Sequence, residues 1–598
     1  MIDDVYEPLS LYRDSFKDEY AKNTAAFFEA LVLASGVDER ANRETVSSIR
    51  SLEQEIAKNT SSSSNWKLLR ILTVLLLASS VVVIGLFVGH VVSPESVSTN
   101  LSVLWLLTGI GALISTSVFL QKKLNPLIRA LDQRLARQKE EHISKMREAW
   151  EQLFPLNQLY DWGMFAKLIQ QTIPRLVLDP FFSLARLYEL RECFGWNDDF
   201  NSDKSVVFAQ SGEINGNPFV LAETLNFEWG AKTYHGSLTI TWEESETYTD
   251  SSGKWKTRRV TRRQTLNATV AKPAPNYTRP KFLIYGNEAA PDLAFSRAPS
   301  SLSGSDGGFF DKMRMKRTVA KLEKLSRNLD DDSNFTIMSN REFDALFHSV
   351  DRNNEIQYRV LFTPLAQQQM VMLLNDKDVG FGDDFHFVKS CMINFVYPAH
   401  LSGLDITAAP DLFQNYDLVG ARRFFNSYSN DYFKHLYFAL APLLTIPIYQ
   451  QHRSHSNIYK SIYGNKASFW EHEAIANFYG QAAFRHPASI TENILKTRPD
   501  NVGNVDVTSH GFRGEDRVEY VRMYGGDGNW HNVPVYWTEY LPVQKTTQLA
   551  IRETDGLTRQ DFKQHFQAAP DWQSFFRDTN ADPTQVIFRR SIAAVLKK

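Results

Sequence analysis

Side chains that could bind a metal ion are concentrated in the last third of the sequence. They are His452, His455, Glu471, His472, Glu473 and His486. Imidazole nitrogens and carboxylate oxygens bind divalent transition metals such as zinc. However, the segment HEAIA at 472–476 lacks the second histidine of an HExxH zinc helix, and the other spacings are irregular. We therefore predict surface or hydrogen-bonded histidines, with no metal and no cofactor, and keep His452, His455 and His472 as the alternative ligands.

The sequence contains no other recognisable catalytic motif. It has neither the GxSxG nucleophile turn nor the GxxxxGKS/T phosphate loop. Its two cysteines, Cys193 and Cys391, lie far apart, and neither belongs to a nucleophile signature. The aspartates at 330–332 and 383–384 stand in predicted loops, where solvation explains them and Ca²⁺ or Mg²⁺ ligation is the alternative. An enzyme is therefore the alternative function: a membrane-tethered enzyme, such as a metal-dependent hydrolase, with its site around residues 452–510.

Two basic segments are the stronger candidates for binding, and the first is a predicted strand. It carries Lys254, Lys256, Arg258, Arg259, Arg262 and Arg263, opposite Glu243, Glu244, Glu246 and Asp250 on the preceding strand. Opposite charges on facing strands stabilise a hairpin by roughly 0.2–1 kcal/mol per pair. The segment is therefore predicted to support its hairpin. The functional alternative is a basic tongue that contacts anionic headgroups or a partner.

The second basic segment is a predicted helix that follows the Gly- and Ser-rich break at 300–308. Its cations include Lys312, Arg314, Lys316 and Arg317. Met313, Val319, Leu322 and Leu325 form an apolar stripe on the same helix. A basic amphipathic helix can lie on anionic lipid, where each cation contributes about 1 kcal/mol. A solvated outer face of a domain helix is the simpler explanation.

Two long apolar runs precede the basic segments in the sequence. Residues 68–92 and 101–120 are long enough, as helices, to cross a hydrocarbon core roughly 30 Å thick. The link between them contains no Lys or Arg, whereas Lys58, Lys67 and Lys122 lie on the outer flanks. Lys and Arg collect on cytoplasmic flanks. We therefore predict a transmembrane hairpin at 66–121, so a multi-pass protein of the cell membrane with both termini cytoplasmic.

The rest of the chain is predicted to be an α+β protein with antiparallel sheets and packed helices. The predicted divisions are N-terminal helices at 1–65, a stalk and helical bridge at 122–200, an α+β domain with an antiparallel meander at 201–398, and a C-terminal α+β domain at 399–598. Turn signals at Asn215-Gly216, Ser252-Gly253 and 526–529 indicate hairpins. The stalk either pairs as an antiparallel coiled coil or consists of separate helices packed on other domains.

Two C-terminal segments carry specific predictions. The apolar stretch 432–449 contains Pro442 and Pro447 and is too short for a clear membrane span. It is predicted to belong to a folded domain, with Phe438, Leu440, Leu443, Leu444 and Ile446 buried against strands. The last residues, FRRSIAAVLKK, are predicted to form a helix.

The residues GEINGNPFVLAE at 212–223 and SNREFDALFHSVDRNNEIQYRVLFTPLAQQQMVMLL at 339–374 follow the two apolar runs in order. This arrangement resembles bacterial integral membrane proteins that carry the domain of unknown function 3137. The resemblance covers roughly residues 60–395 and rests on Glu342-Phe343, Phe347, the segment 355–359 and Thr363-Pro364. It implies a bacterial origin, a cytoplasmic α+β domain behind a membrane hairpin, and no assigned activity.

Charge and composition narrow the choice of partners. A net charge of -2 gives no global basic field for nucleic acid, and aromatic residues at 13% indicate well-packed cores. We predict a membrane-anchored cytoplasmic scaffold or adaptor that binds a protein partner, a second copy of itself or anionic lipid. Membrane lipids would contact its two transmembrane helices.

Overall fold

The computed structural model describes residues 6–92, 99–197, 203–249, 251–300, 302, 309–327, 335–451, 466–500, 504–553 and 585–597. The chain is an α+β protein whose sheets are antiparallel, as predicted. It forms two compact units. The first comprises Met1–Ala26, Asp161–Ala409 and Tyr428–Lys598, and the second comprises Phe27–Tyr160 and Pro410–Ser427. Each unit therefore combines segments that are far apart in the sequence.

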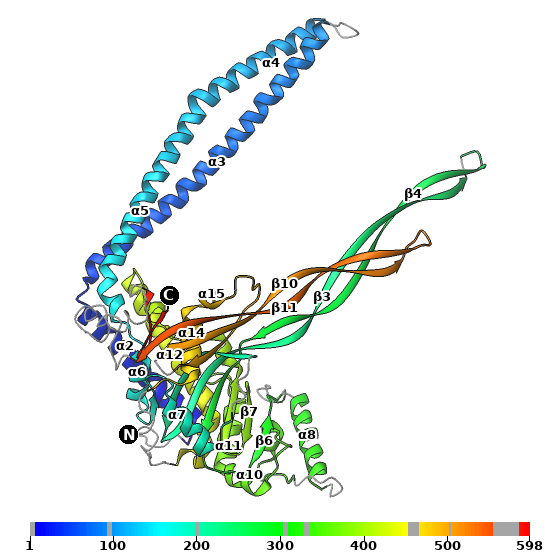
Figure 1. The fold of residues 1–598 in the computed structure, drawn as a ribbon. Helices are drawn as coiled ribbons and strands as arrows, with labels where there is room; N and C mark the ends of the chain where they lie inside the picture. Colours follow the sequence, from blue (N-terminus) through cyan, green and yellow to red (C-terminus); the bar gives the residue numbers. More distant parts are fainter. Residues whose placement is uncertain are drawn as a thin grey trace. The chain divides into compact units, whose positions relative to one another are not determined.

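The second unit is built on two long helical stretches. They are α3 (Glu39–Val92), followed by α4 (Thr99–Phe119), a π-helical turn (Leu120–Leu124) and α5 (Asn125–Leu159). Figure 1 shows α3 running antiparallel to α4 and α5. One series of buried and half-buried residues recurs every three or four positions from the end of the π-helical turn through α5: Leu124, Ile128, Leu131, Leu135, Gln138, His142, Met146, Ala149, Leu153 and Leu156. This spacing suits antiparallel helix pairing, which was one of the two predicted alternatives.

Polar side chains fix the register of α3 against α5. Asn59 donates to Gln138 at 2.8 Å, and Gln138 in turn donates to Glu55 at 2.7 Å. Asp132 accepts hydrogen bonds from Ser63 and Lys67, each at 2.9 Å. Gln138 and Ser63 are buried, so an alignment that left them without partners would be unfavourable, and these contacts therefore favour one helix alignment.

The π-helical turn lies just before Pro126. Proline has no N–H to donate to the carbonyl four residues earlier, so a regular α-helix cannot continue through it. The chain widens to π-helical geometry at Leu120–Leu124 and resumes as α5, which places Pro126 in the first turn of that helix.

One described helix is long and apolar enough to cross a membrane. It is the part of α3 at Glu39–Val82, whose most apolar stretch has a mean hydropathy of 1.5 and is only 6% buried. Two such helices were predicted. In α4 the side chains are described from Leu107 onward, where Leu107, Ile114 and Val118 are exposed.

The first unit contains two antiparallel sheets. The strands of the larger sheet are β1 (Leu176–Leu178), β2 (Lys204–Ile214), β3 (Asn217–Thr249), β5 (Lys281–Gly286), β8 (Ile393–Pro398), β7 (Phe385–Ser390) and β6 (Ala294–Arg297), in that order, with β4 (Trp255–Thr278) paired to β3. The smaller sheet has the order β12 (Ile587–Arg589), β13 (Ile592–Leu596), β11 (Trp530–Glu553), β10 (Asn504–Tyr524) and β9 (Ile494–Pro499). The predicted turn at Asn215-Gly216 joins β2 to β3 with φ values of 53° and 80°, which suit an Asn-Gly hairpin turn.

Helices of 4 to 27 residues complete this unit, two of them only in part. They are α1 (Pro8–Leu11), α2 (Lys17–Ser35), α6 (Met164–Thr172), α7 (Leu184–Tyr188), α8 (Phe309–Arg327), α9 (Arg341–Phe347), α10 (Glu355–Leu361), α11 (Pro364–Asn375), α12 (Leu418–Leu444), α14 (Phe469–Tyr479) and α15 (Gln481–Phe484). The boundaries between the two units fall inside α2 and α12. Helix α14 is shared by two cores, since Trp470 and Ala474 pack with the larger sheet while Ile475 and Ala476 pack with the smaller one.

The stretch 432–449 is buried in a folded unit, as predicted. Its first part belongs to α12, and Phe438, Leu440, Leu443, Leu444 and Ile446 are all at most 4% exposed. The prediction placed these side chains against strands, whereas several aromatic partners of this helix come from the N-terminal helical segment, which the sequence did not indicate. Tyr20 stacks on Phe433 with 4.1 Å between ring centroids, and the Tyr437 hydroxyl donates to the Pro8 carbonyl at 2.7 Å.

The predicted C-terminal helix is wrong. Residues Ile587–Arg589 and Ile592–Leu596 form a tight hairpin, and β13 pairs along β11. Ile592, Ala593, Ala594 and Val595 are all buried. An apolar run without a polar face suits a strand covered on both sides as well as it suits a helix, so neighbouring strands decide its conformation.

Candidate functional site

Two long hairpins extend beyond the sheets and together form the most distinctive feature of the first unit. From Phe227 onward β3 pairs only with β4, and from Gly511 onward β10 pairs only with β11. We call residues 227–278 and 511–548 the arm. Figure 1 shows the two hairpins crossing as they leave the sheets. A single two-stranded hairpin is marginally stable in water, so each hairpin depends on the other.

The arm has its own small core where the hairpins cross. Its buried residues are Ile240, Leu266, Ala268, Val533 and Val535. Gly236 lies at the crossing, where an added Cβ would overlap the Pro534 carbonyl oxygen and lie 2.9 Å from a Val535 methyl group. Only glycine permits two backbones to approach this closely.

The outer face of β10–β11 carries a line of exposed apolar side chains. The aromatic stripe consists of Val518, Tyr520, Tyr524, Trp530 and Tyr536, each between 41% and 71% exposed. Strand pairing places them on one face, because Val518 is opposite Tyr536 and Tyr524 is opposite Trp530. Among the alternate residues, Val533 and Val535 point to the crossing and are buried.

The stripe is ordered by contacts among its own members. The rings of Tyr524 and Trp530 meet edge to face, with 5.5 Å between their centroids. Arg522 lies over Trp530, its guanidinium carbon 5.5 Å from the ring centroid. Rigid, exposed Tyr and Trp side chains give large contact area at low entropic cost, as in many binding surfaces.

The predicted basic strand lies at the far end of β3–β4. The turn of β10–β11 ends against Gln264, whose side-chain oxygen accepts the Gly526 N–H at 2.7 Å, and Figure 1 shows β3–β4 continuing beyond it. Arg258 pairs with Glu246 at 2.9 Å, Arg259 with Glu243 at 3.6 Å and Arg262 with Glu244 at 3.1 Å. These pairs are the cross-strand contacts that the charge pattern indicates. Because they are exposed, each contributes little to stability.

Of the remaining predicted cations of this hairpin, two lie at its tip and the third lies farther along β4. Lys254 and Lys256 flank Trp255, which is 77% exposed. Arg263 lies opposite Thr241, on the face turned away from the Arg258–Glu246 pair. The end of the hairpin therefore combines an exposed indole with positive charge.

The predicted basic helix is α8. Lys312, Arg314, Lys316 and Arg317 lie on it, and the last three are exposed where their side chains are described. Leu322 on the same helix is 2% exposed and packs toward the domain. The structure does not bring these cations together with the basic strand residues Lys254 to Arg263 in any described contact.

The histidine candidates do not assemble into a described metal site. His452 and His455 lie outside the described residues. His472 is on α14, and burial lowers its pKa to about 4. Among the residues that the structure describes, no three or more His, Cys, Asp or Glu side chains are grouped so as to hold a metal.

The glutamates beside His472 hold the two sheets to α14. Glu471 accepts the Phe182 N–H at 3.0 Å and pairs with Arg589 from the β12–β13 hairpin. Glu473 accepts the Val206 N–H at 2.9 Å and pairs with Lys496 at 2.6 Å. Burial raises the pKa of Glu473 to about 7. Glu471, His472 and Glu473 therefore contribute to the packing of the core.

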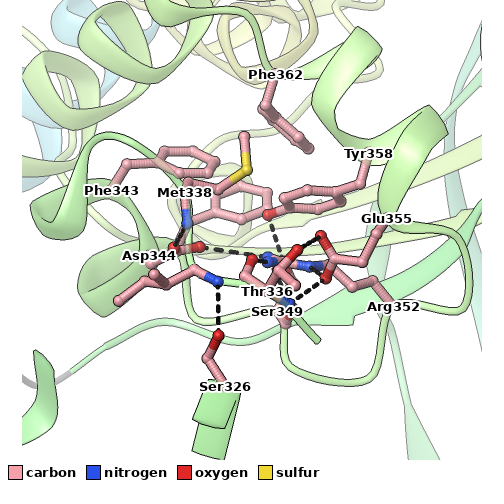
Figure 2. Close-up of polar contacts among 12 residues, drawn as sticks. Ser326, Thr336, Met338, Phe343, Asp344, Ser349, Arg352, Glu355, Tyr358 and Phe362 are labelled. Atoms are coloured by element: carbon pink, nitrogen blue, oxygen red, sulfur yellow. Dashed lines mark hydrogen bonds and ion pairs between the residues drawn. The ribbon is translucent and has the colours of Figure 1, made fainter. Parts of the chain in front are cut away.

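A second buried ionic cluster lies around helices α9 and α10. Arg352 lies between the rings of Phe335 and Tyr358, at 4.4 and 4.0 Å from their centroids. It donates to Glu355 at 2.6 Å and to the Thr336 carbonyl at 2.6 Å, and it pairs with Asp344 at 3.3 Å (Figure 2). Asp344 also accepts the Met338 N–H. These partners satisfy Arg352 internally and tie the preceding loop to α9 and α10.

A cavity of about 420 Å³ lies at the root of the arm. Its lining includes Phe227, Tyr277, Phe512 and His510, and burial lowers the pKa of the His510 imidazole. An enzyme site needs several convergent polar groups with defined mutual geometry. This cavity is lined largely by aromatic and aliphatic groups, whereas the stripe supplies the exposed apolar surface expected of a binding protein.

Sequence reasoning identified the basic strand and missed the aromatic stripe. The signal was present, since Val518, Tyr520 and Tyr524 alternate along one strand and Trp530 and Tyr536 along the next. The intervening residues Val521, Val533 and Val535 are also apolar, so alternation could not show which face is covered. Comparison with protein families, curated proteins and solved structures found no match for this chain.

Proposed function

We propose that this chain is a membrane-anchored cytoplasmic adaptor whose arm binds a protein partner. The observation that carries the proposal is the aromatic stripe: five large apolar side chains exposed on a single face of β10–β11. Exposed apolar patches mark interaction surfaces, and Tyr and Trp supply much of the binding energy at protein interfaces.

The proposed anchor is the pair of apolar segments in α3 and α4, inserted as a two-span hairpin in the cell membrane. The low burial of the α3 stretch supports this reading, because an apolar helix that is not covered by protein needs lipid around it. Lys67 and Lys122 flank the spans, and the link between them has no Lys or Arg. This asymmetry supports cytoplasmic termini. A relationship to proteins with the domain of unknown function 3137 belongs to the same proposal.

The anchor is tested by cysteine labelling in intact cells, at two positions outside the described residues. Ser98→Cys should react with an impermeant thiol reagent, whereas Ser301→Cys should react only after lysis. Labelling of Ser301→Cys in intact cells contradicts this topology.

The arm is tested by placing a photo-cross-linking amino acid at Tyr536 in the full-length protein in native membranes. Thr241, exposed on β3 and turned away from the stripe, is the matched control. We expect a discrete protein adduct from position 536 that is lost in a Tyr520→Ala background, and none from position 241. Equal adducts from both positions, or no effect of Tyr520→Ala, would refute the proposal.

One observation favours a second function, contact with anionic lipid at the tip of β3–β4. Trp255 is exposed between Lys254 and Lys256, and an indole beside cations suits the headgroup region of a membrane. The test uses full-length protein in nanodiscs of neutral lipid, mixed with anionic vesicles at about 0.1 M salt, where the Debye length is roughly 10 Å. Vesicle capture that disappears in Trp255→Ala supports the lipid contact, and absence of capture rejects it.

A further inference from the structure

The face of β10–β11 that carries the aromatic stripe has two charged residues between 516 and 538. Along β10 this face presents Asp516, Val518, Tyr520, Arg522 and Tyr524, and along β11 it presents Trp530, Asn532, Pro534, Tyr536 and Thr538. Asp516 and Arg522 are thus the only charges, of opposite sign, placed on either side of the centre of the stripe. In the described part of the chain Asp516 has no ion pair.

This pattern is complementary to itself. When two identical surfaces meet across a two-fold axis, each contact between two different residues occurs twice. A two-fold axis that lies in the contact plane, perpendicular to the strands between Val518 and Tyr520, places Asp516 of each copy opposite Arg522 of the other. The same arrangement places the stripe of one copy on the stripe of the other, so that apolar and charged contacts form together.

We infer that the aromatic stripe binds the same stripe on a second copy of this chain. This inference rests on the proposed function, because it names the partner of the proposed binding surface. The occupant is identified by charge complementarity: the face is neutral overall and places its two opposite charges where only an antiparallel copy pairs both.

The size of the stripe indicates where this association takes place. The nine residues 516–524 of β10 are eight steps of about 3.4 Å, and two strands lie about 5 Å apart, so the face measures roughly 27 Å by 10 Å. A stable soluble dimer buries about 800 Å² per partner, which is more than this face offers. Two copies anchored in one membrane have a high effective concentration, so a small contact becomes sufficient. Association is therefore expected in membranes and should weaken after dilution in detergent.

The test uses the full-length chain in native membranes with Val518→Cys, a change that keeps a small apolar side chain near the proposed axis. The exposed Cys391 is replaced by Ser in every version to lower the background, since the other native thiol, Cys193, is partly buried. A bis-maleimide cross-linker that spans about 10 Å, the spacing of packed sheets, should give a linked dimer, and Thr241→Cys on the other hairpin should give none.

Charge variants then test the pairing itself. Arg522→Asp or Asp516→Arg alone places like charges opposite each other in both contacts, and should reduce the linked dimer about tenfold. Co-expression of the two single variants with different tags should restore dimer between them, since both contacts become Asp–Arg pairs again. Recovery in the mixture also shows that neither variant is misfolded.

The outcomes separate the two proposals. Unchanged dimer in the single charge variants, or no recovery in the mixture, overturns pairing between copies. If Val518→Cys captures a different protein and no second copy, the adaptor function stands and the self-association fails. If cross-linking from the stripe captures nothing, both fail.

Discussion

Replacement of Gly236 by Ala should separate the two hairpins of the arm without unfolding the sheets. The new Cβ would overlap the Pro534 carbonyl oxygen, a backbone atom that cannot rotate away, and would lie 2.9 Å from a Val535 methyl group. Relief of this overlap needs a separation of about 1 Å, enough to lose a quarter to a half of the dispersion attraction across the crossing. Gly230→Ala, on the same strand, is the matched control because its nearest neighbour, Asn276 Cβ, is 3.4 Å away.

The size of the effect follows from the cost of overpacking a small core, about 1–3 kcal/mol. The core at the crossing contains Ile240, Leu266, Ala268, Val533 and Val535 and has no other covering layer in the described structure. The arm amides should therefore exchange hydrogen about 5- to 150-fold faster in Gly236→Ala, since 1.4 kcal/mol corresponds to a factor of ten. Amides of β5 and β8, which lie in the sheet, should be unchanged.

Hydrogen exchange followed by mass spectrometry of the detergent-solubilised full-length protein measures this directly. Arm peptides in Gly230→Ala should match the unmodified protein, because the nearest atoms to its added Cβ, Asn276 Cβ at 3.4 Å and the Ala274 carbonyl oxygen at 3.7 Å, are at ordinary contact distance. If the arm amides are as well protected from exchange in Gly236→Ala as in Gly230→Ala, the hairpins do not support each other at this crossing. Acceleration across the whole first unit would mean that the arm core also holds the sheets.

Three further predictions concern the core and the charged hairpin. Burial lowers the pKa of His472 to about 4, below its ordinary value, so the native state resists protonation and loses stability as pH falls from about 6.5 to 4. Thermal unfolding of His472→Gln should show a weaker loss of stability over this range. An identical acid profile would contradict the buried neutral imidazole. Tyr20 is fully buried and stacked on Phe433, so Tyr20→Ala should destabilise the first unit by about 3–5 kcal/mol in thermal or denaturant unfolding, whereas Leu33→Ala, at an 85% exposed position, should change it little. Arg258→Glu should lower the free energy of unfolding by at most about 1 kcal/mol, because the ion pair with Glu246 is exposed. Adding Glu246→Arg should recover that loss in a double-mutant cycle. A loss of several kcal/mol would show that this pair is buried in solution.

Features that depend on neighbours in the sequence were predictable from the sequence. Gly36 ends α2 with a φ of 64°, and Asn215-Gly216 forms the turn between β2 and β3, because these residues tolerate positive φ. The facing of Glu246 and Arg258 follows from the hairpin turn between them, which sets the register of both strands. The antiparallel sheets and the burial of residues 438–446 likewise follow from local patterns of apolar residues.

Features that depend on distant segments were decided by the tertiary structure. His472 and its neighbouring glutamates read as metal ligands by type, yet α14 is inserted between two sheets and each glutamate finds backbone and cationic partners there. The run Ile592–Leu596 becomes a strand because β11 offers it an edge. No pattern within a short window contains either partner, since they lie tens to hundreds of residues away.

Two neighbouring residues of the arm show clearly what the sequence determines and what the tertiary structure decides. Val535 and Tyr536 are adjacent apolar residues on one strand, and their sequence predicts only that they point to opposite faces. Val535 is fully buried while Tyr536 is 71% exposed. The difference arises because β3–β4, about 270 residues earlier in the chain, crosses on the side of Val535 and leaves the other side without cover. The sequence determined the two-faced strand, and the crossing of a distant hairpin decided which face remains available for binding.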